Sequence, residues 1–213
     1  MILILPIKSG TRWTPVALSD YSTLLQGTDL TAGYRLKNLS NIMLPIIAEH
    51  EGGKTDLAKT QLNIKSVLSA LGDQPCFEID GVRQNLDDEW LDVTIRTNAA
   101  MVRGHRNFAK RLDPESLNAY PARELVQIEI GSEPYDWNAR WTQSGGQMHG
   151  GRMIALKNEP VWLRIGDFGH PHPPFAFESS MDVKEISRVE AVELKLTDWR
   201  SEIQVSPCPI CNA

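Results

Sequence analysis

Two long stretches of the sequence have the apolar spacing of amphipathic helices. The first covers residues 56–71, where Asp56 is a capping residue and Gly72 a stop, and Thr60 is the one polar member of the apolar stripe. The second covers residues 88–111, with acids at its start and bases at its end, as the helix dipole favours. Its apolar stripe contains Leu91, Ile95, Ala99 and Val102. Both segments are predicted to be helices with one buried face.

Alternating apolar and polar residues predict a small amount of β-structure. In residues 124–130, Val126, Ile128 and Ile130 point to one side, which is typical of a half-buried strand. Residues 152–156 form a short apolar run that predicts a second strand, and residues 76–79 are a short extended piece in a loop. The pattern as a whole predicts an α+β fold: several helices, long ordered loops and a small β-sheet built from residues 122–130 and about 152–156.

The remaining segments are shorter or irregular. Residues 1–33 have weak periodicity and are predicted to be irregular, and a helix over residues 34–50 would be broken or kinked by Pro45. Short helices are predicted after the capping residues Asp136, Asn158 and Ser187, the last of them reaching about residue 196, and residues 166–181 are predicted to be an ordered loop.

These elements suggest three regions along the chain. Residues 1–86 form an N-terminal helical and irregular region, residues 87–196 form the α+β domain, and residues 197–213 form a tail that is predicted to be mobile because it contains Pro207 and Pro209.

Composition and charge exclude several classes of protein. The chain has 213 residues, 41% of them hydrophobic, and a formal net charge of -5, so neither a wholly disordered chain nor a globally basic nucleic-acid coat is expected. The odd number of cysteines, three, argues against a secreted disulfide framework. No apolar run approaches the roughly 18 residues that a membrane span needs, and the start lacks the features of a signal peptide.

The clearest charge feature lies at the end of the second long helix. Five Lys or Arg residues fall between residues 96 and 111, and Asp92 and Asp113 are the nearest acids on either side. Arg103, Arg106 and Lys110 recur at helical spacing and share a face, with Arg111 beside them. This face suits contacts with the phosphates of DNA. A solvated helix end, favoured by the dipole, is the simpler interpretation.

Aromatic residues are concentrated in the second half of the chain. The residues considered for contact with a partner protein are Trp137, Trp141, Trp162, Phe175 and Phe177. Such anchors are common at interfaces, and they are equally common as plugs of a small core with little regular structure. The core interpretation is favoured, with partner contact as the alternative.

Neither a metal site nor a cofactor site is predicted. Cys208 and Cys211 have the spacing of a zinc or redox pair, but a second such pair is missing from the sequence. His149, His170 and His172 are interpreted as loop histidines, the last two packed by phenylalanines. The acids at residues 87–92 are interpreted as helix-start acids. No catalytic motif with the required spacing is present, so an enzyme is not predicted.

From about residue 91 onward, the order of several short segments resembles the phage Mu F-like head morphogenesis proteins, also called minor head proteins. The segments are IRTNAAMVRG at residues 95–104, PARELV at 121–126, DWNARW at 136–141 with Gly145 and Gly146, GRMIALK at 151–157, PVW at 160–162, PPFAFESSMDV at 173–183, and Ser187 with Arg188. The resemblance covers residues 91–196, about half of the chain. The family's closing pattern, His-Pro followed by Cys-rich residues, is not reproduced, because His172 and Pro173 lead into an aromatic loop.

The resemblance implies a structural component of a tailed-phage virion. Such a protein is made in the host cytoplasm and assembled in several copies at or near the portal, with portal, capsid or neck proteins as partners. No catalytic residue is implied. Two other functions stay open: a DNA-contacting accessory protein of packaging that uses the basic face, and a hydrolytic enzyme that uses His149, His170 or the acids near residue 88.

Overall fold

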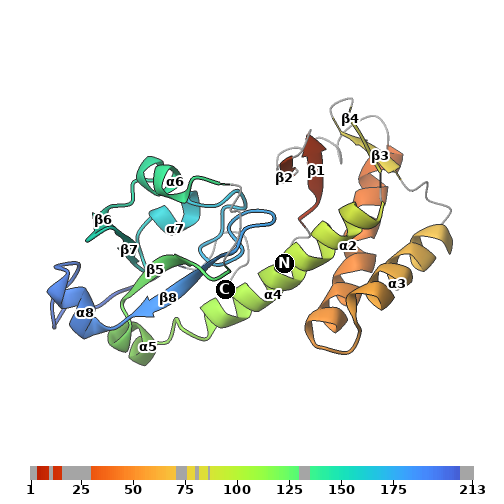
Figure 1. The fold of residues 1–213 in the computed structure, drawn as a ribbon. Coiled ribbons are helices and arrows are strands. Elements are labelled where there is room, and N and C mark those ends of the chain that lie inside the picture. Colours follow the sequence, from red (N-terminus) through yellow and green to blue (C-terminus); the bar gives the residue numbers. More distant parts are fainter. Residues whose placement is uncertain are drawn as a thin grey trace. The chain divides into compact units, whose positions relative to one another are not determined.

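The computed structural model describes most of the chain, namely residues 4–9, 12–15, 30–70, 76–79, 82–85, 87–129 and 135–206. Within these ranges the chain contains seven helices and eight short strands, which confirms the predicted α+β fold (Figure 1). The chain forms two compact units, Met1–Val102 and Arg103–Ala213. The boundary between them falls inside a helix, 16 residues after the predicted boundary between residues 86 and 87.

The first unit contains two small hairpins. Strands β1 (Pro6–Ser9) and β2 (Arg12–Pro15) pair antiparallel, as do β3 (Cys76–Ile79) and β4 (Val82–Asn85). The extended piece at residues 76–79 is therefore confirmed as a strand. The prediction that residues 1–33 are irregular is wrong for the first hairpin, because four-residue strands are too short to show a period.

Three helices complete the first unit: α2 (Leu30–Glu51), α3 (Leu57–Ala70) and the first part of α4 (Asp88–Ala109). Pro45 lies inside α2 and does not end it, contrary to the simplest expectation. Met43 and Ile47, on either side of this proline, are fully buried, and α2 packs against α3. Tertiary packing therefore outweighs the loss of one helical hydrogen bond.

The α4 helix binds the start of the chain through two buried side chains. Asn98 accepts a hydrogen bond from the amide of Ile4 and donates one to its carbonyl, both at 2.8 Å. The indole Nε1 of Trp90 donates to the carbonyl of Pro6 at 2.9 Å. These contacts place the first part of α4 in the first unit, which explains why the unit boundary lies inside the helix and not before it.

The second unit is built on a four-stranded antiparallel sheet. Its strand order is β6 (Met148–His149), β7 (Arg152–Leu156), β5 (Ala122–Gln127) and β8 (Met181–Ile186). Strand β7 has the bounds that the sequence predicts. Gly150 and Gly151, at φ of 61° and 81°, form the two-residue turn between β6 and β7, a backbone conformation that favours glycine.

The central strand β5 begins at Ala122, as the predicted sheet does, and ends at Gln127, before the end of the predicted segment at residue 130. Ile128, which was predicted to face the core, is 61% exposed. Residues 122–125 are all buried because β5 is paired on both sides and covered on both faces. Alternation therefore misplaces this strand, since alternation marks only strands with one solvated face.

Four short helices surround the sheet: α5 (Pro114–Ala119), α6 (Trp137–Gln143), α7 (Val161–Arg164) and α8 (Arg188–Glu193). The predicted caps of α6 and α8 are confirmed, because Asp136 accepts from the amide of Ala139 and Ser187 from that of Glu190. The cap predicted at Asn158 is wrong, since α7 follows Pro160 without a side-chain cap. The α8 helix ends at Glu193, not near residue 196.

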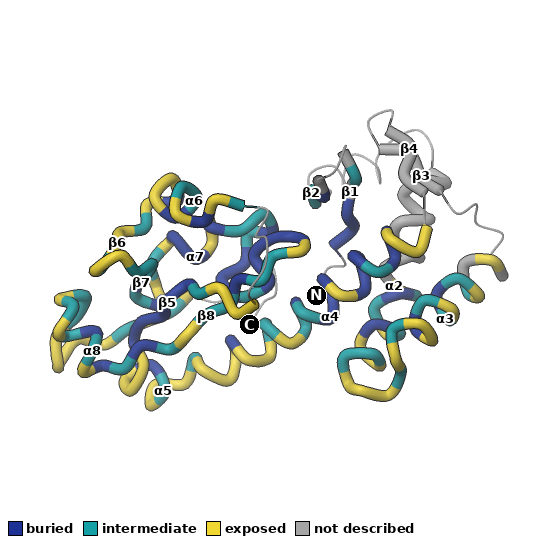
Figure 2. The backbone as a smooth tube through the Cα atoms, in the orientation of Figure 1, coloured by how far each residue is buried: buried dark blue, intermediate teal, exposed yellow. Residues whose placement is uncertain are grey.

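The sheet has an apolar core on each face. On one face, Leu125 and Ala155 pack with residues of α6 and α7. On the other, Ala122, Ile154 and Ile186 pack with Ala191 of α8. Residues 166–180 contain neither helix nor strand, which confirms the predicted loop, and Figure 2 shows that most of it is buried. This buried loop forms part of the core on the α6 and α7 face.

The described part of the tail is fastened to the second unit by Arg188. Its Nε donates to the carbonyl of Asn118 at 2.6 Å, and its Nη1 donates to the carbonyls of Asp198 at 2.9 Å and Ser201 at 3.0 Å. Residues 197–206 have no helix or strand, and the prolines and cysteines at 207–211 lie outside the described residues. None of the described helices combines the length and the apolar character that crossing a membrane requires.

Candidate functional site

The predicted basic face lies at the surface of the second unit. Arg103, Arg106, Lys110 and Arg111 are all exposed, the first two within α4 and the other two directly after it. Arg111 donates to Glu185 of β8 at 2.8 Å, so its charge is offset inside the protein. Arg103, Arg106 and Lys110 are the other exposed cations of this face.

The five aromatic residues considered for partner contact are core residues. Trp137 and Phe177 are 5% and 1% exposed, and Trp141, Trp162 and Phe175 are fully buried. The indole nitrogens of Trp141 and Trp162 donate to backbone carbonyls of Gln147 and Leu156, both at 2.9 Å. The interpretation of these aromatic residues as core residues is confirmed. The alternative, direct contact with a partner protein, is wrong for these side chains, because almost none of their area reaches the surface.

A buried polar cluster that the sequence did not indicate centres on Arg123 of β5. The guanidinium is 2% exposed, and its carbon lies 4.5 Å from the ring centre of Trp162 and 5.4 Å from that of Phe108. Its Nη1 donates to the carbonyl of Pro171 at 3.0 Å, whereas Nε and Nη2 are buried without a partner. Burial lowers the pKa of Arg123 to about 10, with Glu185 opposing, so the group is charged at neutral pH.

Three histidines extend the cluster beside Arg123. The rings of His170 and His172 stack at 4.2 Å with an interplanar angle of 12°, and His105 of α4 lies 5.7 Å from His172. Burial and the neighbouring His172 lower the pKa of His170 to about 3, and burial lowers that of His172 to about 4, so both are neutral at pH 7. Phe168 lies 5.6 Å from His170, which confirms the predicted phenylalanine packing for this histidine.

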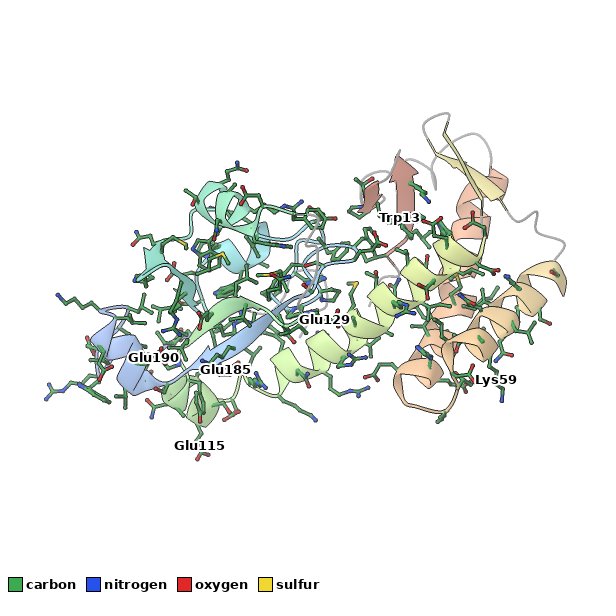
Figure 3. The ribbon with its side chains drawn as sticks, viewed as in Figure 1. Trp13, Lys59, Glu115, Glu129, Glu185 and Glu190 are labelled. Carbon is green, nitrogen blue, oxygen red and sulfur yellow. The ribbon has the colours of Figure 1, made fainter. Side chains whose placement is uncertain are left out.

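The carboxylate of Glu185 on β8, which Figure 3 labels, acts electrostatically on Arg123, its register partner on β5. One of its oxygens binds Arg111, and the other lies 2.6 Å from the amino group of buried Lys157, off the direction of a good hydrogen bond. Burial lowers the pKa of Lys157, and Glu185 opposes that shift. Two cations therefore share Glu185, and Arg123 is left without a carboxylate in contact.

The other candidate residues have structural roles where the structure describes them. Asp88, Glu89 and Asp92 pair with Lys65, Lys8 and Arg96, which agrees with helix-start acids. His149 is half-buried in β6, and Cys208 and Cys211 lie outside the described ranges. Among the described residues, no three His, Cys, Asp or Glu side chains are grouped so that they could hold a metal ion.

The sequence contained one signal for the cluster around Arg123, which the sequence analysis missed. Arg123 lies inside strand β5, and this strand ends beside the end of the loop at residues 166–180. Only the strand pairing shows that Arg123 is central and buried, because its neighbours Glu185 and Ala155 come from strands far along the chain. Compared with models of protein families, with curated proteins and with solved structures, this chain has no match.

Proposed function

We propose that this chain is a structural component of a tailed-phage virion, a minor head or head–neck protein that acts through protein contacts near the portal. The proposal rests on the ordered resemblance of residues 91–196 to minor head proteins. In this proposal the chain is made in the host cytoplasm and incorporated in several copies. Portal, capsid or neck proteins are its partners.

The observation that carries the proposal is where the resembling segments lie. All but the first fall within one compact unit, and they supply its sheet, its caps and its core. In chain order, the resembling segments first occupy part of α4, strand β5, and α6 with its cap. They then occupy strand β7, the start of α7, the end of the loop at residues 166–180 with the start of β8, and the cap of α8. The resemblance is thus carried by residues that specify a fold, which supports a shared structural module.

The decisive experiment examines particles of the phage or prophage that encodes the chain. Particles are banded in a density gradient, treated with nuclease and protease, and analysed by quantitative mass spectrometry against the major capsid protein. We expect the chain to band with the particles at a fixed ratio to the major capsid protein. Its absence from intact, infectious particles would rule out the virion role.

A second candidate, contact with DNA, is favoured by the exposed Arg103, Arg106 and Lys110. Binding of a labelled duplex is measured by anisotropy for the wild type and for the triple alanine variant of these residues. If they contact phosphates, the variant binds more weakly and its log–log salt dependence is shallower by about 3. The matched control replaces three exposed cations elsewhere, Lys54, Lys59 and Arg164, with alanine. Equal loss in both variants would mean non-specific charge attraction.

A further inference from the structure

The two unpartnered nitrogens of Arg123 form a specific pair. Nε and Nη2 lie on the same edge of the planar guanidinium, the edge whose two parallel N–H bonds fit the two oxygens of a carboxylate or phosphate. Nη1 already donates to the Pro171 carbonyl. The two unpaired donors, Nε and Nη2, are therefore the pair that binds a carboxylate or phosphate side-on. Leaving both donors unpaired in a buried site is costly, by about 1–3 kcal/mol for each group.

The charges around this edge favour an anion over water. At neutral pH Arg123 is charged, and both stacked histidines are neutral. Glu185 is in contact with Arg111 and Lys157, so it compensates Arg123 only in part and without contact. The rings of Trp162 and Phe108 offset part of the positive charge but accept no hydrogen bond in the plane of the guanidinium.

Further unpaired polar atoms belong to the histidines of the same cluster. Both ring nitrogens of His170 and the Nδ1 of His105 are buried without a partner. The rings of His105 and His170 both lie next to the ring of His172. The ring of Phe108 lies near both His172 and the guanidinium of Arg123. A buried neutral imidazole offers one N–H that could donate to a bound oxygen. Five unsatisfied atoms in one cluster are a typical indication of a bound polar species.

We propose that Arg123 holds a small oxyanion, a carboxylate or a phosphate, on its Nε and Nη2 edge inside the second unit. The end of α4 and residues 168–172 enclose the site. The anion neutralises the buried guanidinium and joins β5 to the aromatic loop, so binding and folding of this unit are coupled.

The first test is thermal unfolding of the full chain after exhaustive dialysis into chloride buffer. Formate and phosphate are titrated separately against chloride at matched ionic strength. We expect one of them to raise the melting temperature saturably, by roughly 5 °C at a hundredfold excess over its dissociation constant. Saturation by formate assigns a carboxylate, and saturation by phosphate assigns a phosphate. A response no larger than that of chloride would overturn the proposal.

Variants separate binding at Arg123 from general salt effects, since phosphate also stabilises proteins by exclusion from their surface. Arg123→Lys keeps the charge and loses the fork, so the saturable response should disappear. Arg164→Lys, at an exposed arginine of α7, should respond like the wild type. An unchanged response in Arg123→Lys would refute the proposed site.

A second measurement needs only the wild type and applies even if Arg123→Lys does not fold. Crystals grown in chloride are soaked in selenate, and the anomalous signal locates the anion. A peak within hydrogen-bond distance of Nε and Nη2 of Arg123 supports the proposal. An anion-free edge occupied by water alone contradicts it.

Discussion

At the scale of single residues, the second unit contains an unusual number of titratable groups held away from water. An arginine charge lies near two aromatic rings, and two imidazoles in the same cluster are kept neutral at pH 7. Such groups make the unit sensitive to protonation, because each histidine gains a proton more readily in the unfolded chain than in the folded one.

Acid should therefore destabilise the protein well above the range in which carboxylates titrate. Unfolded histidines bind protons near pH 6.5, whereas the pKa of His170 is lowered to about 3 and that of His172 to about 4. The free energy of unfolding therefore has its highest value above pH 6.5. It decreases toward pH 5, by up to roughly 1.4 kcal/mol per pH unit for each histidine. Urea unfolding at a series of pH values measures this slope.

The variant His170→Phe should make that slope shallower, since phenylalanine does not titrate and matches the apolar surroundings. His149→Gln, at a half-buried histidine outside the cluster, is the control. If His170→Phe loses stability between pH 6.5 and 5 as steeply as the wild type, burial of this imidazole does not govern acid sensitivity.

Replacing Gly104 with alanine should destabilise the protein, although Gly→Ala usually stabilises a helix. In an open helix, Gly→Ala stabilises by about 0.5–1 kcal/mol. Here an added Cβ would lie 1.8 Å from the carbonyl oxygen of Pro173, so the helix and the loop would have to separate. We expect Gly104→Ala to lower the free energy of unfolding by roughly 2 kcal/mol or more.

Chemical denaturation measures this change, and Asn107→Ala, at an exposed position of the same helix, is the control. A stabilised Gly104→Ala protein would show that this loop does not pack against α4 in solution.

At the scale of elements, the sequence predicts what is local and misses what depends on pairing. The long α3 and α4 follow from period and caps, and β7 follows from its apolar run. The strands β1, β4 and β8 carry no comparable local signal and exist because another strand lies beside them. The burial of Arg123 is missed for the same reason, since its neighbours come from five separate segments: α4, β7, α7, the loop at residue 171 and β8.

The α4 helix gives a test of how elements are joined in the first unit. Asn98→Ala removes both hydrogen bonds to Ile4 and leaves a buried amide and carbonyl unpaired. We expect a loss of roughly 2 kcal/mol and faster hydrogen exchange at the Ile4 amide. Mass spectrometry of deuterated peptides measures the exchange.

Arg96→Ala, which removes only an exposed ion pair with Asp92, should change stability by less than about 0.5 kcal/mol. Unchanged exchange at Ile4 in Asn98→Ala would contradict the role assigned to Asn98.

At the scale of the whole molecule, the predicted division of the chain needs two corrections. The unit boundary lies inside α4, after Val102. The tail predicted to begin at residue 197 is bound to the second unit at least as far as Ser201, because Arg188 holds the carbonyls of Asp198 and Ser201.

Limited proteolysis tests the second correction. Arg188→Ala removes the donor to both carbonyls, so trypsin should cleave after Lys195 and Arg200 several times faster than in the wild type. Mass spectrometry of the fragments over time gives both rates. Cleavage after the exposed Lys54 is the internal reference. Equal rates in the two proteins would show that Arg188 does not hold this segment.

The hydrogen bonds from Arg188 to the carbonyls of Asn118, Asp198 and Ser201 also determine where the chain can be shortened for crystallisation or for fusion to a reporter. A stop codon after α8 would delete two of the three carbonyls that bind the guanidinium of Arg188, which is only 8% exposed, and those donors would turn to water at the new end of the chain. A stop placed after residue 201 keeps all three carbonyls, so expression trials of the second unit should begin from that length.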